Sequence, residues 1–299
     1  MLRGVAREDR GSVRSHRALR RTAIAVGGSE GGGAPRDDGW LARFEAALSS
    51  GDPLGASDAL RKSGTNGWVR KASYDRALPV LERLRPAPLV RLNWAERLIA
   101  HPRRVDKELA AEMLAPLAKT HTREVTRAAY RLAREEDWGV REAAATLVGR
   151  LLVDAFNDVL PTMSDWVRGP DSRVRRAVVV GAKSAARTRR PEWAEPLLDL
   201  LEPALKDENE YVRKNLGPFT IGDQFLRSYP DATLARLRKW MEDPDENVRW
   251  NVAMAFAAAS GARLAQRAPD ILDFLAKDER PLVRNAVRAA RRRVRTLAA

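Results

Sequence analysis

A short element built around the dipeptide Val-Arg recurs along this chain and restricts its fold more than any other feature. Each copy opens with an acidic or turn residue and continues into a helical pattern, as in DWGVREAAATLVG from residue 137 and DENVRWNVAMAF from residue 245. The seven valines lie 34 to 38 residues apart, at Val69, Val105, Val140, Val174, Val212, Val248 and Val283. A period of this length is typical of stacked helical pairs. The sequence therefore predicts an all-α solenoid of about seven helical pairs.

The position of the element within each pair indicates the type of repeat. D-x-x-V-R at the head of the second helix is typical of HEAT repeats, in which the valine enters the core and the arginine bonds acidic groups of adjacent turns. We therefore expect the arginines after the valines to form a structural ladder, and we do not count them as a DNA site. They are Arg70, Arg141, Arg175, Arg213, Arg249 and Arg284.

The first 39 residues differ from the rest of the chain. They combine arginines with a glycine run and have almost no apolar periodicity. Such a segment cannot bury enough surface to offset the entropy of ordering it. We expect residues 1–39 to be a disordered basic, Gly-rich tail and residues 40–299 to be the repeat domain. A basic arm that touches DNA and a transit-like peptide are the alternatives for the tail.

The amino-acid composition excludes several kinds of site and favours one class of partner. The chain has 54 Lys and Arg against 40 Asp and Glu, a formal net charge of +14, which favours polyanionic partners, nucleic acid before membrane. It has no cysteine and three histidines, so disulfides, thiolate nucleophiles and cysteine-bound metals are excluded. No apolar run approaches the roughly 18 residues of a membrane span. We expect no metal, no cofactor and no membrane contact.

One column of side chains is a candidate for nucleic-acid binding. The residue two after each valine is rotated away from the ladder, toward the side expected to be concave. This column reads Lys71, Lys107, Glu142, Arg176, Lys214, Trp250 and Asn285. A face with four cations and one aromatic suits a phosphate backbone. The alternative is an ordinary solvated face.

Glu142 is the carboxylate of this column, and Trp138 lies one helical turn before it. An indole beside a carboxylate can stabilise positive charge, such as the charge that develops on a sugar when a glycosidic bond breaks. The structural alternative is that Trp138 packs between repeats while Glu142 pairs with Arg176 or Arg141.

Residues 135–252 resemble the HEAT-like DNA alkylation repair glycosylases of the AlkC and AlkD type. The matching stretches are DWGVRE, LPTMSDWVRGPDSRVRRAV, KDENEYVRKNLG and RSYPDATLARLRKW. The resemblance implies that Trp138 and Glu142 face the lesion, and that Arg176 contacts the DNA backbone. Lys214, Lys71, Lys107 and Trp250 would extend the DNA-binding surface.

The chain departs from the AlkD-type branch in three ways. Glu142 stands where that branch has Asp, and Gly217-Pro218 stands where it has a second aromatic. The segment GPFTIGDQF, residues 217–225, also carries about two extra residues, and we expect it to interrupt its helix. Phe219 is a candidate substitute for the missing aromatic.

Two functions remain open from the sequence. The first is a monofunctional DNA glycosylase that removes N3- or N7-alkylated purines from duplex DNA, acting as a monomer in the bacterial cytoplasm at the nucleoid. The second is a non-catalytic HEAT scaffold that binds protein or nucleic acid through the same face.

Overall fold

The computed structural model describes residues 39–65 and 68–298. The expected tail, residues 1–39, lies outside this part of the chain except for Gly39. The chain divides into residues 1–38 and residues 39–299, and the second unit is described here. Within its described ranges it contains helices and one isolated β-bridge, between Thr65 and Trp68, and no strand. The all-α prediction is confirmed.

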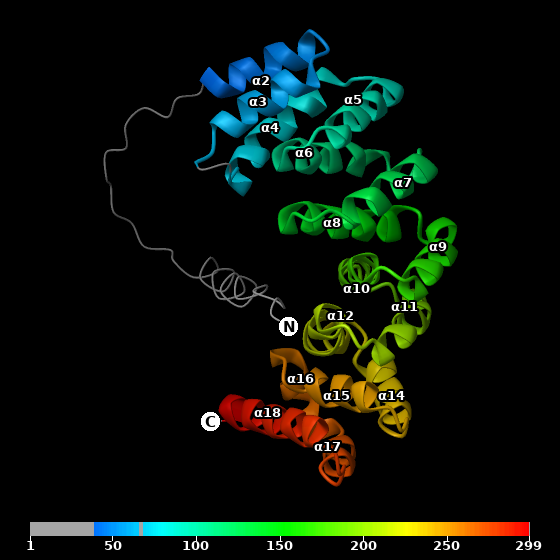
Figure 1. The fold of residues 1–299 in the computed structure, drawn as a ribbon. Helices are drawn as coiled ribbons and strands as arrows, with labels where there is room; N and C mark the ends of the chain where they lie inside the picture. The colour runs from blue at the N-terminus through cyan, green and yellow to red at the C-terminus, as the bar shows by residue number, and fades with distance from the viewer. Residues whose placement is uncertain (1–38, 66–67, 299) are drawn as a thin grey trace, which may run out of the picture. The chain divides into compact units, whose positions relative to one another are not determined.

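The helices alternate along the chain between two layers, and each layer is stacked in chain order (Figure 1). The first layer contains α5 (Pro88–Ala100), α7 (Thr122–Ala133), α9 (Phe156–Arg168), α11 (Ala194–Leu201), α14 (Pro230–Met241) and α17 (Pro269–Leu275). The second layer contains α6 (Arg104–Leu114), α8 (Trp138–Asp154), α10 (Ser172–Ala186), α12 (Glu210–Asn215), α15 (Glu246–Ala255) and α18 (Pro281–Ala298). Consecutive helices of a layer contact one another, except that α12 is joined to α15 through η4 (Leu216–Phe225), the π-helix that follows α12. Each pair therefore covers the apolar face of the next.

Shorter elements complete the stack. At its N-terminal end α2 (Gly39–Ser49), α3 (Pro53–Lys62) and α4 (Lys71–Leu84) pack together, and α3 also contacts α5 and α6. The remaining elements are α13 (Leu226–Ser228), α16 (Ala259–Leu264), and the short 3₁₀ turns η1 (Ala115–Leu117), η2 (Pro191–Trp193), η3 (Glu202–Lys206) and η5 (Ala265–Arg267). None of the described helices has the length and apolarity needed to cross a membrane.

The repeated element begins the second-layer helices, and its acidic residue explains where they begin. Asp137 accepts hydrogen bonds from the backbone N–H groups of Gly139 (2.7 Å) and Val140 (3.2 Å). Asp171, Asn209 and Asp245 cap α10, α12 and α15 in the same way. Such caps satisfy N–H groups that have no partner within the helix. The valine that follows is then buried: six of the seven, from Val105 to Val283, are at most 3% exposed.

The first copy of the element is different. Val69 and Arg70 precede α4, whose first residue is Lys71, and Val69 is only partly buried. This copy therefore opens an additional helix at the end of the stack, and the regular second layer starts at α6.

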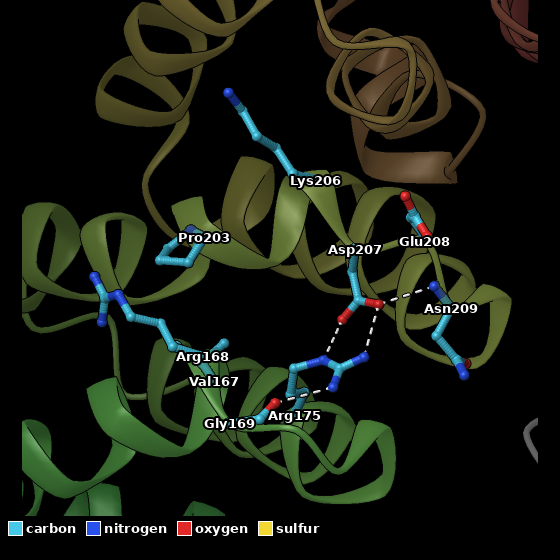
Figure 2. Close-up of a pocket in the computed structure, with 9 residues that line it drawn as sticks. All are labelled: Val167, Arg168, Gly169, Arg175, Pro203, Lys206, Asp207, Glu208 and Asn209. Carbon is cyan, nitrogen blue, oxygen red and sulfur yellow. Dashed lines mark hydrogen bonds and ion pairs between the residues drawn. The ribbon is translucent and has the colours of Figure 1, made fainter.

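The arginine ladder is present in part, because two of its members bond acidic residues of the next repeat. Arg141 and Arg284 bond loop carbonyls instead, and Arg213 bonds Asn247. Arg175 donates to both carboxylate oxygens of Asp207 in the next repeat, at 2.6 and 3.0 Å, and to the carbonyl of Gly169 (Figure 2). It also donates to the carbonyl of Pro170. Arg249 likewise bonds Asp278 of the next repeat and the carbonyl of Asp243. These arginines therefore fix the loop before their own helix and join it to the following repeat.

The α-helix is interrupted in residues 217–225, as expected, but by a π-helix and not by a break in helical structure. The backbone stays helical from Glu210 to Ser228. It passes from α12 into a π-helix, η4 (Leu216–Phe225), and then into α13. The wider π turns accommodate the extra residues. A Cβ on Gly222 would lie 2.3 Å from the Ala255 carbonyl oxygen, so glycine allows the close approach of η4 to α15.

Candidate active site on the second layer

Trp138 and Glu142 lie on one exposed face of α8, as their spacing predicted. Trp138 is the first residue of the helix and is 37% exposed. The Glu142 side chain is also 37% exposed, although most of α8 is buried. An indole and a carboxylate are therefore both accessible at the beginning of this helix.

Glu142 forms an ion pair with Arg176 of the next second-layer helix, α10. Arg176 is only 5% exposed, and its Cζ lies 4.8 Å from the centroid of the Tyr211 ring on α12. Its Nη2 also approaches Asn215 Oδ1 at 3.5 Å. From the sequence, pairing of Glu142 with Arg176 was one structural alternative to a catalytic role, and this pairing is present. The geometry holds the carboxylate in a fixed place and leaves little of the guanidinium accessible.

Tyr211 organises this region, and sequence reasoning missed it. Its ring lies under both Arg176 and Arg141, and its hydroxyl accepts a hydrogen bond from Arg141 Nε at 3.2 Å. Within the described part of the chain, Nε and Nη1 of Arg176 are buried without a hydrogen-bond partner. The π face of Tyr211 provides a favourable interaction for this cation. The motif ENEYVRK contained the tyrosine, but nothing in its spacing related it to a residue 35 positions earlier.

A second indole stands beside Trp138. Trp68, which precedes α4 and is 54% exposed, has its ring centroid 6.3 Å from that of Trp138. Arg104 contacts both rings, with Cζ 3.8 Å from the Trp68 centroid and 5.8 Å from the Trp138 centroid. A Cβ on Gly139 would meet the Arg104 guanidinium at 2.0 Å, so glycine makes room for it. We call Trp68 and Trp138 the indole pair.

The sequence did not reveal the indole pair. Trp68 lies 70 residues from Trp138 in the copy of the repeat that departs from the pattern. The two rings meet where α6 packs against α8, with Arg104 of α6 in contact with both. The pair supplies an aromatic surface next to Glu142, although the AlkD-type aromatic is absent at Gly217-Pro218.

The three lysines of the column are each paired with a carboxylate. Lys71 and Lys214 bond acidic residues one turn away on their own helices, Asp75 at 2.5 Å and Glu210 at 2.8 Å. Their side chains are 85% and 54% exposed. Lys107 pairs with Glu135 at 2.7 Å and its side chain is only 12% exposed. The column is therefore less positive than its list of residues indicates.

Trp250 and Phe219 lie farther along the second layer. Trp250 is half-buried against the core, with Arg213 Cζ 5.8 Å from its centroid. Phe219, on η4, is 38% exposed and lies under Lys183. In the described ranges no group of three or more His, Cys, Asp or Glu is placed to hold a metal ion.

A hollow of about 690 Å³ lies elsewhere, at the loops between the layers (Figure 2). Val167, Pro203 and Lys206 line it together with the Arg175–Asp207 pair. None of the site residues predicted from the sequence lines it. Because its central ion pair belongs to the arginine ladder, we do not associate it with the chemistry of Glu142.

Two family models match this chain. Residues 79–222 match the model of the DNA alkylation repair enzyme family, and residues 198–291 match HEAT repeats. The first match contains Trp138, Glu142, Arg176 and Lys214. No curated protein matches the chain.

Solved structures of repeat proteins also match. A designed armadillo repeat protein is 16% identical over 68% of this chain and 99% of its own length, with a TM-score of 0.31. A computationally designed armadillo repeat protein for modular peptide recognition is 13% identical over 85% and 99%, with a TM-score of 0.32. The chain therefore contains, over residues 79–222, a segment that matches the DNA alkylation repair enzyme family, and HEAT repeats continue it to residue 291.

Proposed function

We propose that this protein is a monofunctional DNA glycosylase that removes N3- or N7-alkylated purines, such as 3-methyladenine or 7-methylguanine, from duplex DNA. The observation that carries the proposal is the exposed Glu142 carboxylate, fixed by Arg176 and next to the exposed indole of Trp138. This arrangement lies within the segment that matches the DNA alkylation repair family. We further propose that it acts as a monomer in the cytoplasm, at the nucleoid, without a cofactor.

The chemistry requires little from the protein beyond charge and position. An N3- or N7-alkylated purine is cationic and leaves readily, so no general acid is needed. Glu142 stabilises the positive charge that develops on the sugar and positions the attacking water. Trp138 packs against the lesion sugar.

Arg176 has a different role from the one the resemblance alone implies. Because it is buried and paired with Glu142, we assign it the orientation of the carboxylate. A direct phosphate contact by Arg176 would require its guanidinium to leave this pair. Lys214 and Lys71 are exposed enough to exchange their carboxylate partners for phosphates, and Lys107 and Trp250 border the same face.

The test is Glu142→Gln in a single-turnover release assay with duplex DNA that contains 7-methylguanine. We expect the excision rate to fall by roughly 10² to 10³, the usual cost of removing one preorganised electrostatic group. The duplex Kd should stay unchanged. The control is Glu124→Gln on α7, whose side chain is similarly exposed at 42% and lies in the first layer, and this variant should excise normally.

The ion pair of Glu142 with the buried Arg176 favours the second candidate, a non-catalytic scaffold. In that case the Glu142–Arg176 pair serves stability alone. Glu142→Gln would then lower the melting temperature, and neither parent nor variant would release the base. Measuring excision and melting temperature on the same preparations separates the two functions.

A further inference from the structure

A group of cations lies on the same face of the second layer, beyond the candidate active site. Arg176, Val180, Lys183 and Arg187 follow one another at intervals of three and four residues, so they share one face of α10 and its C-terminal cap. Lys183 stands seven residues after Arg176, which corresponds to about 10 Å along the helix. Arg187 is exposed, and Lys183 is partly buried.

The π-helix brings further groups to Lys183. Phe219 of η4 lies beneath the amine, with Nζ 5.7 Å from the ring centroid. Asp223 of η4 accepts a hydrogen bond from Arg227 Nη2 at 2.7 Å, and the Arg227 side chain is 47% exposed. Arg227 and Asp223 both approach Ser260 Oγ at 3.3 Å. α10 packs against η4, and the charges of Arg187, Arg227 and Asp223 all act on Lys183. This region therefore holds three cations and one carboxylate, an excess of positive charge.

The crowding affects Lys183 directly. Burial lowers the pKa of its amine, and the charges of Arg187 and Arg227 lower it further, while Asp223 opposes them. An anion between the three cations would remove this repulsion. A bound phosphate would supply the negative charge that this cluster lacks.

We propose that Lys183, Arg187 and Arg227 form a second phosphate-binding site, which takes a backbone phosphodiester of the duplex whose lesion lies at Glu142. This proposal depends on the proposed function, because that function supplies duplex DNA as the ligand. The distance along α10 supports this ligand, because about 10 Å is comparable with the roughly 12 Å width of the major groove. One duplex can then contact both the Glu142 region and this cluster.

The first experiment measures Kd for an undamaged 20-base-pair duplex between 50 and 200 mM NaCl. Lys183→Gln and Arg187→Gln should each lower the slope of log Kd against log salt by about 0.9. Lys183→Arg should restore it, because the charge is retained. Arg127→Gln on α7 is the matched control, since its side chain is 68% exposed in the first layer, and it should leave the slope unchanged.

The second experiment observes the amine itself by NMR of ¹³C-labelled lysine. The Lys183 pKa should rise on addition of the duplex and stay unchanged with inorganic phosphate at the same ionic strength. An equal rise with inorganic phosphate alone would indicate a site for a free anion and overturn the proposal.

The outcomes separate this inference from the proposed function. If the parent releases no base but the Lys183→Gln slope falls, the phosphate site stands and the glycosylase does not. If the parent excises and the slopes of both variants match the parent's, the phosphate site is overturned alone. A parent that does not bind duplex removes both.

Discussion

Asp278 shows how strongly a single residue can join two repeats. Its side chain is 2% exposed and accepts hydrogen bonds from Arg249 Nη1 at 2.8 Å and from Arg280 Nε at 2.8 Å. The bonds from Arg280, and then those from Arg249, hold the pKa of the carboxyl far below its usual value. Its charge therefore contributes to stability above the unfolded-state pKa of about 4, and the contribution is lost as the pH falls through and below that value.

We predict that Asp278→Ala lowers the free energy of unfolding at pH 7 by about 2 to 4 kcal/mol, since it leaves the partly buried Arg249 and Arg280 without their carboxylate partner. Asp278→Asn should be less stable than the parent at pH 7, and the difference should shrink as the pH falls below about 4. Urea unfolding at pH 7 and pH 3 measures both. A difference that is the same at the two pH values would mean that this carboxyl does not titrate as proposed.

At the residue scale, the sequence predicts neighbours on one helix better than contacts between helices. The Val-Arg spacing correctly predicted that Trp138 and Glu142 share a face, because helical geometry determines neighbours one turn apart. It left open whether Glu142 pairs with Arg176 or Arg141, since Arg141 directly precedes Glu142 and Arg176 holds the same position as Glu142 in the next repeat. It could not find Trp68, because contact between residues 70 positions apart depends on how whole helices pack.

At the scale of elements, the π-helix η4 is the feature that local preferences predicted least well. Proline and glycine disfavour an α-helix, and α12 does end before Gly217-Pro218. Packing keeps the chain helical beyond this point as a π-helix, because Gly217 and Gly222 place the backbone of η4 directly against Asn251 and Ala255 of α15. Tertiary contact, absent from any local window, decided the conformation.

We predict that Gly222→Ala destabilises the protein by about 1 to 3 kcal/mol, the usual cost of overpacking. Its Cβ would lie 2.3 Å from a backbone oxygen and 2.8 Å from the Ala255 Cα, and backbone atoms cannot rotate away. The control is Gly55→Ala in α3, where the nearest atom belongs to the flexible Asp52 side chain. That variant should be neutral or slightly stabilising, because alanine favours a helix. Equal melting temperatures for both variants would contradict the close approach of η4 and α15.

At the scale of the whole molecule, the net charge of +14 does not identify the cations that are free to contact DNA. Many cations are engaged internally, as the ladder arginines bond loop carbonyls and acidic residues of the next repeat. The period of the Val-Arg element correctly predicted the repeated helices, and the composition indicated a basic protein. It could not show which cations remain accessible, because that depends on the carboxylates that folding places beside them.

Accessibility therefore predicts an order among the lysines of the column in their effect on duplex binding. Lys71→Gln and Lys214→Gln should each lower the salt slope of duplex affinity by about 0.9, since each lysine can exchange a solvent-exposed carboxylate for a phosphate. Lys107→Gln should change it little, because Lys107 is 12% exposed and held by Glu135. Fluorescence anisotropy with one undamaged duplex at several salt concentrations measures all three.

The matched control replaces three exposed lysines away from this face, Lys119, Lys239 and Lys277, with glutamine together. Combining Lys71→Gln with Lys214→Gln removes less charge than this triple variant does. If DNA is held by the second-layer face, the double variant should nevertheless lower the slope more. If the slope follows the number of charges removed and not their position, the affinity comes from net charge alone, and the column is a solvated face. The position of the charge, at nearly constant composition, is thus what distinguishes a binding surface from a generally basic protein.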